Sequence, residues 1–136
     1  MLLWALSVLC QAFIFGAIAF FSALVAPLVF SALPAETAAG FIRRIFPRYY
    51  LSLIIIGVVG GLAALPFDGW VGLALLLIAA GAVYARQILM PAANRARDDE
   101  RRGAPGAAAR FRRLNQLSVV INLLQLVVIV AALLAF

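Results

Sequence analysis

The stretch RFRRLNQLSVVINLLQLVVIVAALLAF, residues 110–136, decides the class of protein. Three arginines precede an apolar run, residues 114–136, that contains no charged side chain. As a helix, this run is long enough to cross the ~30 Å hydrocarbon core of a bilayer. Basic residues next to a membrane helix favour the cytoplasmic side. We therefore expect this segment to enter the membrane from the cytoplasm and to end outside it.

Three further apolar segments lie upstream of this one. They predict membrane helices over about residues 2–33, 48–65 and 70–89. The first would be ~48 Å long as a straight helix, so we expect Pro27 to kink it. The residues between the second and third segments, Pro66 to Gly69, are typical of a tight turn, with Asp68 as a helix cap. The prediction is a single all-α domain, an integral membrane four-helix bundle with up-down topology.

The basic residues lie in two connections, residues 34–47 and 92–113, or at their edges. All eleven are arginines, and the chain has no lysine. We expect both connections to be cytoplasmic loops, with a short interfacial helix as an alternative for the first and a solvated linker for the second. This places the N- and C-termini on the non-cytoplasmic side. Six arginines are candidates for contact with lipid headgroups or with an acidic partner: Arg43, Arg44, Arg48, Arg110, Arg112 and Arg113.

Composition excludes several functional classes. The chain is 67% apolar, so its net charge of +6 indicates membrane insertion and lipid contact, not nucleic-acid binding. It has no histidine, which excludes haem, chlorophyll or metal bound through imidazole. The one cysteine, Cys10, is expected to be a buried structural thiol. The first segment has no basic residue before it and is too long for a signal peptide, so we interpret it as a retained helix.

Small side chains predict where the helices pack, because close backbone approach drives helix association in lipid. The first helix carries alanines and a glycine at alternating spacings of four and three residues, and the second and third carry glycine pairs of the GxxxG type. The candidate packing residues are Gly16, Ala19, Ala23, Gly57, Gly61 and Gly81. Contact with a second copy of the chain through one such face is an alternative use.

A stripe of polar residues runs along one face of the last helix. Its members are Asn115, Ser118, Asn122 and Gln125. Polar groups at mid-bilayer depth need partners, so we expect the stripe to point into the bundle. Gln11 reaches a depth similar to that of Gln125, and we predict that the two amides approach each other. Interhelical hydrogen bonding and a polar pathway are the two interpretations of this stripe.

The stripe belongs to a longer pattern that resembles the closing signature of the transmembrane protein 205-like family. The pattern begins at Phe111 and Leu114 and continues through the four stripe residues. Other matching pieces appear in order: Ala26-Pro27 with Phe30 and Leu33, Phe46 to Tyr50, and Pro91 with Asn94, Arg97 and Asp98. Asn115 stands where that family usually has histidine. The resemblance implies a four-helix membrane protein of unknown function and supplies no reaction.

Three functional hypotheses follow. The first is a non-catalytic accessory or assembly subunit, without cofactor or metal, that packs against other membrane subunits or against itself. The alternative is a small transporter or channel that uses the polar stripe. An enzyme or a pigment- or quinone-binding protein is the third, and we expect no enzyme because no catalytic set of side chains is visible. The alanine- and arginine-rich composition indicates a bacterial inner membrane as the location.

Overall fold

The computed structural model describes residues 1–136 as helices joined by short turns. The helical segments, in order, are α1 (Leu2–Phe20), η1 (Phe21–Val25), α2 (Ala26–Ala32), α3 (Ala35–Ala64), α4 (Gly69–Tyr84), η2 (Ala85–Leu89), α5 (Met90–Arg101) and α6 (Ala107–Ala135). The two η segments are single π-helical turns within longer rods. The all-helical prediction is therefore confirmed.

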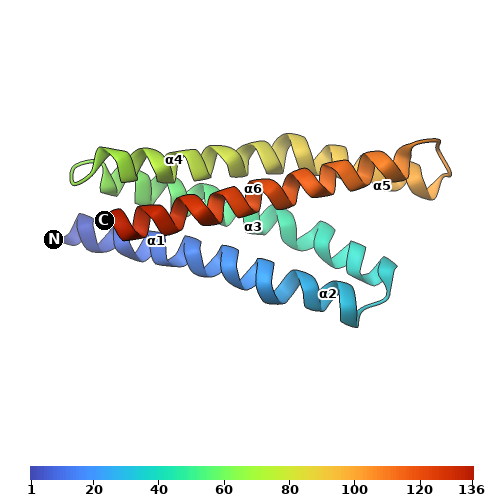
Figure 1. The fold of residues 1–136 in the computed structure, drawn as a ribbon, viewed down its shortest axis with the longest axis horizontal. Helices are drawn as coiled ribbons and strands as arrows, with labels where there is room; N and C mark the ends of the chain where they lie inside the picture. The colour runs from blue at the N-terminus through green and yellow to red at the C-terminus, as the bar shows by residue number, and fades with distance from the viewer.

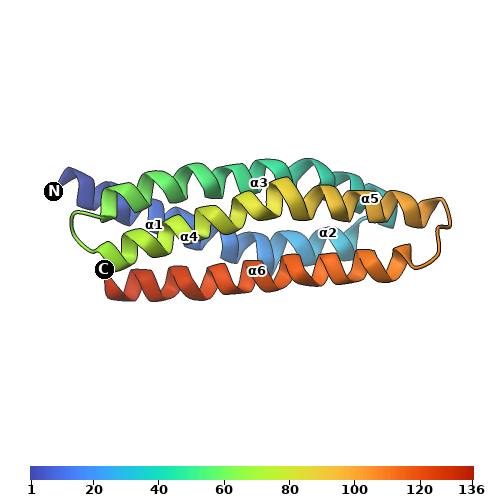
Figure 2. The same cartoon turned by 90° about the horizontal axis from the view of Figure 1, so that it is seen from above.

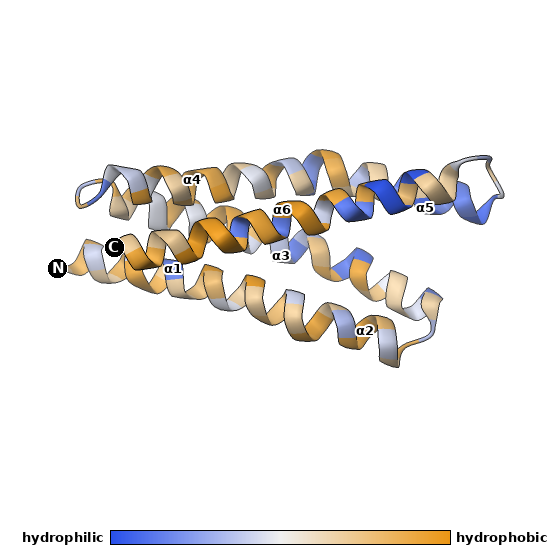
Figure 3. Ribbon diagram, in the orientation of Figure 1, coloured by the Kyte–Doolittle hydropathy of each residue, from blue (hydrophilic) through white to orange (hydrophobic).

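Four rods make up the bundle, and each is long and apolar enough to cross a membrane: Leu2–Ala32, Ala35–Ala64, Gly69–Arg101 and Ala107–Ala135. They lie side by side, with both termini at one end (Figures 1 and 2). We call the opposite end the arginine end. It carries the turn at residues 33–34 and the turn at residues 102–106, and Figure 3 shows that polar residues gather there.

The predicted loops 34–47 and 92–113 are wrong, because nearly all of these residues are helical. The helix α3 begins at Ala35, α5 continues to Arg101, and α6 begins at Ala107. Charged residues mark the end of the hydrocarbon but not the end of a helix, and Arg, Glu and Ala all favour helix. Only residues 102–106 form a true turn, with Gly103 and Gly106 at φ values of +77° and +74°.

The turn between α3 and α4 agrees with its prediction. A carboxylate oxygen of Asp68, Oδ1, accepts hydrogen bonds from the backbone N–H groups of Trp70 at 3.0 Å and Val71 at 3.3 Å. These bonds satisfy donors that the first turn of a helix leaves free. The short turn brings α3 and α4 together as the most extensively packed pair of helices.

Each π-helical turn ends two residues before a proline. Pro27 follows η1 and Pro91 follows η2, and both lie in the first turn of the next α-helical segment. Proline lacks a backbone donor and its ring crowds the carbonyl one turn earlier, so a wider turn accommodates it. A π-helical turn is thus present next to Pro27, where the sequence predicts a kink. Pro47, in contrast, lies inside α3.

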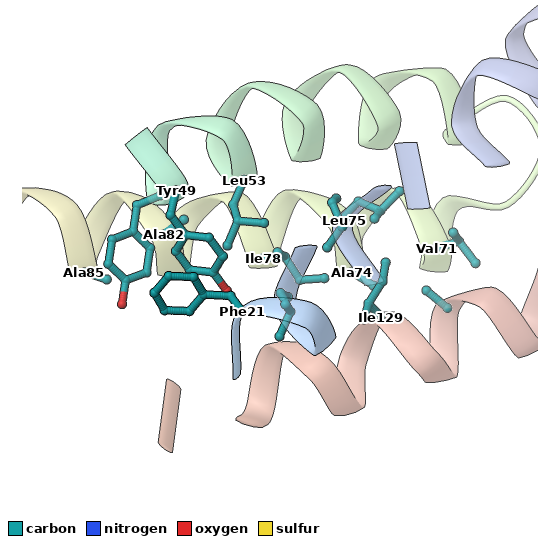
Figure 4. Close-up of a cluster of buried hydrophobic side chains, with 14 of the residues drawn as sticks. Phe21, Tyr49, Leu53, Val71, Ala74, Leu75, Ile78, Ala82, Ala85 and Ile129 are labelled. Carbon is teal, nitrogen blue, oxygen red and sulfur yellow. The ribbon is translucent and has the colours of Figure 1, made fainter. Parts of the chain in front are cut away.

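The core consists of apolar side chains from all four rods. Figure 4 shows Phe21, Leu53, Leu75, Ile78 and Ile129 within one cluster. Only 30 of 136 residues are buried, and many leucines, valines and phenylalanines are exposed around the bundle. An exposed apolar surface of this extent is stable in a bilayer, where lipid chains cover it.

The inward face of α1 differs from the predicted one. Ser7, Gln11, Ile14 and Ile18 are buried, whereas Gly16 and the neighbouring small residues point away from the bundle. Nothing lies within 4 Å of a Cβ built at Gly16. In a membrane both faces of a helix are apolar, so small side chains alone do not tell the inner face from the outer one.

Candidate functional site

The polar stripe of α6 forms hydrogen bonds to three other rods. The hydroxyl of Tyr50 lies 3.0 Å from Ser118 Oγ. The hydroxyl of Tyr49 donates to Asn122 Oδ1 at 2.8 Å, and Asn122 Nδ2 donates to Ser22 Oγ at 2.8 Å. Asn122 therefore links α6 to α3 and to η1 in one chain of bonds.

Gln125 completes the stripe one turn further along α6. Its Nε2 donates to the backbone carbonyl of Ile78 at 3.0 Å, and the side chain lies against Gly81 of α4. Asn115, at the other end of the stripe, makes no side-chain hydrogen bond and lines a cavity. Three of the four stripe residues thus hold helices together, and the fourth remains free to meet a ligand.

Gln11 and Gln125 make no hydrogen bond to each other. Gln11 Nε2 donates to Ser7 Oγ at 3.2 Å, and Ser7 Oγ donates to the carbonyl of Gly60 at 3.1 Å. Gln11 thereby supports the contact between α1 and α3, whereas Gln125 forms a hydrogen bond between α6 and α4. The Oε1 atoms of both glutamines are buried without a partner.

Tyr49 and Tyr50 are site residues that sequence reasoning missed. These two side chains are buried, at 8% and 2% exposed. Tyr49 stacks on Phe21 with ring centroids 4.6 Å apart. The Tyr49 hydroxyl donates to the half-buried amide of Asn122, and the Tyr50 hydroxyl shares a hydrogen bond with the half-buried hydroxyl of Ser118. The stripe itself was the signal, because it required partners at the same depth on another helix.

The glycines on α3 and α4 agree with the packing prediction. A Cβ at Gly57 would lie 3.1 Å from the carbonyl oxygen of Leu75, and one at Gly61 would lie 3.0 Å from that of Gly72. These two glycines let α3 and α4 approach closely. Ala19 of α1 is half-buried, whereas Ala23 is exposed like Gly16.

A cavity of about 510 Å³ opens at the arginine end. It lies where α2 and α3 diverge from α5 and α6 (Figure 1). Its floor includes Tyr50, Leu89 and Ser118, and its rim carries Arg97 and Arg101. An apolar interior with a few polar groups at defined positions is typical of a small-molecule site.

Ion pairs hold the helices together around this cavity. Arg43 of α3 meets Asp98 Oδ1 of α5 at 2.9 Å and also donates to the carbonyl of Asn94. Arg110 of α6 meets Asp99 Oδ2 at 2.6 Å. Asp98 and Asp99 therefore belong to a helix with partners on both sides, and the prediction of a solvated linker is wrong for residues 92–101.

The other candidate arginines make no ion pair and are exposed: Arg44, Arg48, Arg112 and Arg113. Arg48 donates to the carbonyl of Arg44 in its own helix at 3.1 Å. Arg86 donates through Nε to the carbonyl of Pro47 at 3.2 Å. This bond ties η2 to the segment of α3 that holds the proline.

Comparison with known proteins gives the family but no activity. No curated protein and no solved structure matches the chain. Residues 9–102, which run from α1 to the turn after α5, match a family described as a domain of unknown function, DUF4149. The matched region includes Tyr49, Tyr50 and most of the cavity, and ends before the polar stripe of α6. The chain belongs to the DUF4149 family.

Proposed function

We propose that this protein is a non-catalytic integral membrane subunit that packs through the outer face of α1 against a transmembrane helix of a larger complex. The observation that carries the proposal is an exposed small-residue face formed by Ala12 and Gly16 of α1 and continued by Ala23 of η1. Small residues let two helix backbones approach closely in lipid. Within the chain no helix covers this face, since a Cβ at Gly16 would meet nothing within 4 Å.

The proposal includes an orientation in the membrane and a cellular location. With the arginine end in the cytoplasm, the termini lie outside, and a bacterial inner membrane fits the composition. The charge distribution supports this orientation, because the opposite end carries Asp68 and no arginine. Reporter fusions at Phe136 and within residues 102–106 test it: the first should report a non-cytoplasmic position and the second a cytoplasmic one.

Gentle extraction at native expression, followed by a native gel and mass spectrometry, tests the partner. We expect a stoichiometric larger membrane complex, and we expect Gly16→Leu to release the protein from it. Ala80→Leu is the matched control, because Ala80 is exposed on α4. A wild-type protein that migrates alone, or as a homo-oligomer, would overturn the accessory-subunit proposal.

A transporter is the second candidate, and the cavity is the observation that favours it. The cavity extends from the charged rim to Ser118, and the bonded pair Asn122 and Ser22 lies beyond it. Solute flux into proteoliposomes tests this candidate. Flux that is lost in Asn122→Leu or Gln125→Leu, in protein that remains folded, would support transport.

The finer family identity is also a proposal. The pattern around Phe111 to Gln125 resembles the transmembrane protein 205-like family and lies outside the residues matched by DUF4149. It supports a four-helix membrane protein and adds no reaction.

A further inference from the structure

The cavity at the arginine end has a polarity gradient along its length. Arg101 and Arg97 line its rim, Asn94 and Asn115 follow, and Leu89 lines the deep part. From Arg101 to Ala85, both of which line the cavity, the rod rises roughly 24 Å at ~1.5 Å per residue. A charged rim above an apolar interior matches an amphiphile, with its headgroup at the rim and a chain below.

Where α2 and α6 line the cavity, the lining includes exposed residues, Phe30 of α2 and Asn115 of α6. Around the bundle, α1 packs on α3 and α6, and α4 packs on the same two helices. The rod of α1 and α2 is therefore a neighbour of α6, but α2 diverges from α6 towards the arginine end (Figure 1). In a membrane this lateral side lies in the bilayer, so a lipid of the same leaflet can enter without crossing water.

Two cations at the rim have no carboxylate partner. Arg43 is paired with Asp98, but neither Arg97 nor Arg101 makes an ion pair. They lie four residues apart on α5, on one face of the helix, and the Arg97 guanidinium packs over the Phe111 ring at 5.2 Å. Planar guanidinium groups bind phosphate oxygens well, because they donate several hydrogen bonds in a fixed geometry.

One anion at the rim is also without a partner. Glu36, in the first turn of α3, lines the cavity and makes neither an ion pair nor a side-chain hydrogen bond. A purely anionic headgroup would meet this carboxylate unfavourably. A headgroup with both a phosphate and an ammonium would satisfy the two arginines and the carboxylate together.

We propose that this cavity binds one phospholipid with an amine-bearing headgroup, of the phosphatidylethanolamine type. Arg97 and Arg101 hold its phosphate, Glu36 accepts hydrogen bonds from its ammonium, and the free amide of Asn115 meets the ester groups below. The acyl chains lie against the apolar floor and leave through the gap between α2 and α6. This assignment is independent of the accessory-subunit proposal, because it uses the interior of the bundle and not the outer face of α1.

Native mass spectrometry of the delipidated full-length protein tests the proposal. The probe is an equimolar mixture of phosphatidylethanolamine, phosphatidylglycerol and phosphatidylcholine with identical acyl chains. We expect one phosphatidylethanolamine to be retained in preference to the other two lipids. In the double variant Arg97→Gln, Arg101→Gln, its apparent Kd should rise at least about tenfold. Retention of phosphatidylglycerol in preference, or of all three lipids equally, would overturn the assignment.

Matched variants separate a built site from general attraction of lipid to positive charge. Arg112→Gln with Arg113→Gln removes the same charge outside the cavity and should leave retention unchanged. Glu36→Gln should abolish the preference for the amine headgroup while keeping one bound phospholipid. If the Arg97 and Arg101 variant does not fold, Ala39→Trp, which fills the cavity without changing charge, should abolish retention. Equal loss in the control and cavity variants, or full retention in Ala39→Trp, would refute the proposal.

Discussion

Replacing Asn122 by leucine should destabilise the bundle by about 1–3 kcal/mol. The substitution removes two hydrogen bonds of 2.8 Å, one to the hydroxyl of Tyr49 and one to Ser22. Interhelical hydrogen bonds in membranes average about 0.6 kcal/mol and reach about 1.7 kcal/mol. Tyr49 is 8% exposed, so its orphaned hydroxyl has little access to water and adds a desolvation cost. Leucine recovers part of the loss through its apolar contacts.

Reversible unfolding in mixed SDS and detergent micelles, followed by circular dichroism, measures this loss. A double-mutant cycle with Tyr49→Phe isolates one bond, with an expected coupling of about 0.5–1.7 kcal/mol. Gln116→Leu is the control, because Gln116 is an exposed amide on the same helix and makes no side-chain hydrogen bond. It should change stability by no more than about 0.5 kcal/mol. Wild-type stability in Asn122→Leu, or additivity of the cycle within about 0.3 kcal/mol, would refute the structural role of this bond.

Substitutions at four further positions have expected outcomes in the same unfolding assay. Gly60→Ala should lower the free energy of unfolding by about 1–3 kcal/mol, since its Cβ would lie 2.6 Å from that of Cys10. Gly16→Ala should be neutral or slightly stabilising, because its Cβ would meet nothing within 4 Å. Equal effects of the two substitutions would contradict the packing. Asp68→Ala should lower the free energy of unfolding by about 0.5–2 kcal/mol. Asp68→Asn should lower it much less, because asparagine also caps helices. Arg110→Gln should cost less than about 1 kcal/mol despite its 2.6 Å contact, since that ion pair is half-exposed; a larger loss would indicate a network.

The existence of the four rods could be predicted because a lipid bilayer allows a chain few backbone conformations. A backbone in hydrocarbon must satisfy its own hydrogen bonds, so each long apolar segment becomes a helix. The cap at Asp68 followed from local chemistry and is present in the structure. The lengths of the rods could not be predicted in the same way, because the charged segments beyond the hydrocarbon form helix as readily as loop.

The orientation of each rod about its own axis was harder to predict. For α6 the polar stripe identified the inner side, because an amide in hydrocarbon must find a partner. For α1 the faces differ only in the size of apolar side chains, and the bulky Ile14 and Ile18 face inward while Gly16 faces outward. The partners Tyr49 and Tyr50 were missed because tyrosine is also favoured at a membrane interface. The cavity was missed because it depends on the divergence of whole helices.

The π-helical turn Phe21–Val25 has a consequence for how sequences of this family are aligned. A π-turn holds about one residue more than an α-turn, so it acts as a one-residue insertion within a continuous rod. Deletion of one residue there would restore regular helix and leave α2 with the same face toward the bundle, because the wide turn absorbs the extra residue. If the unchanged sequence ran on as regular α-helix instead, everything after the turn would be rotated by roughly 100° and Val29 would leave its buried position. A one-residue gap just before Pro27 in an alignment would therefore indicate members that lack the π-turn but keep the same α2 face.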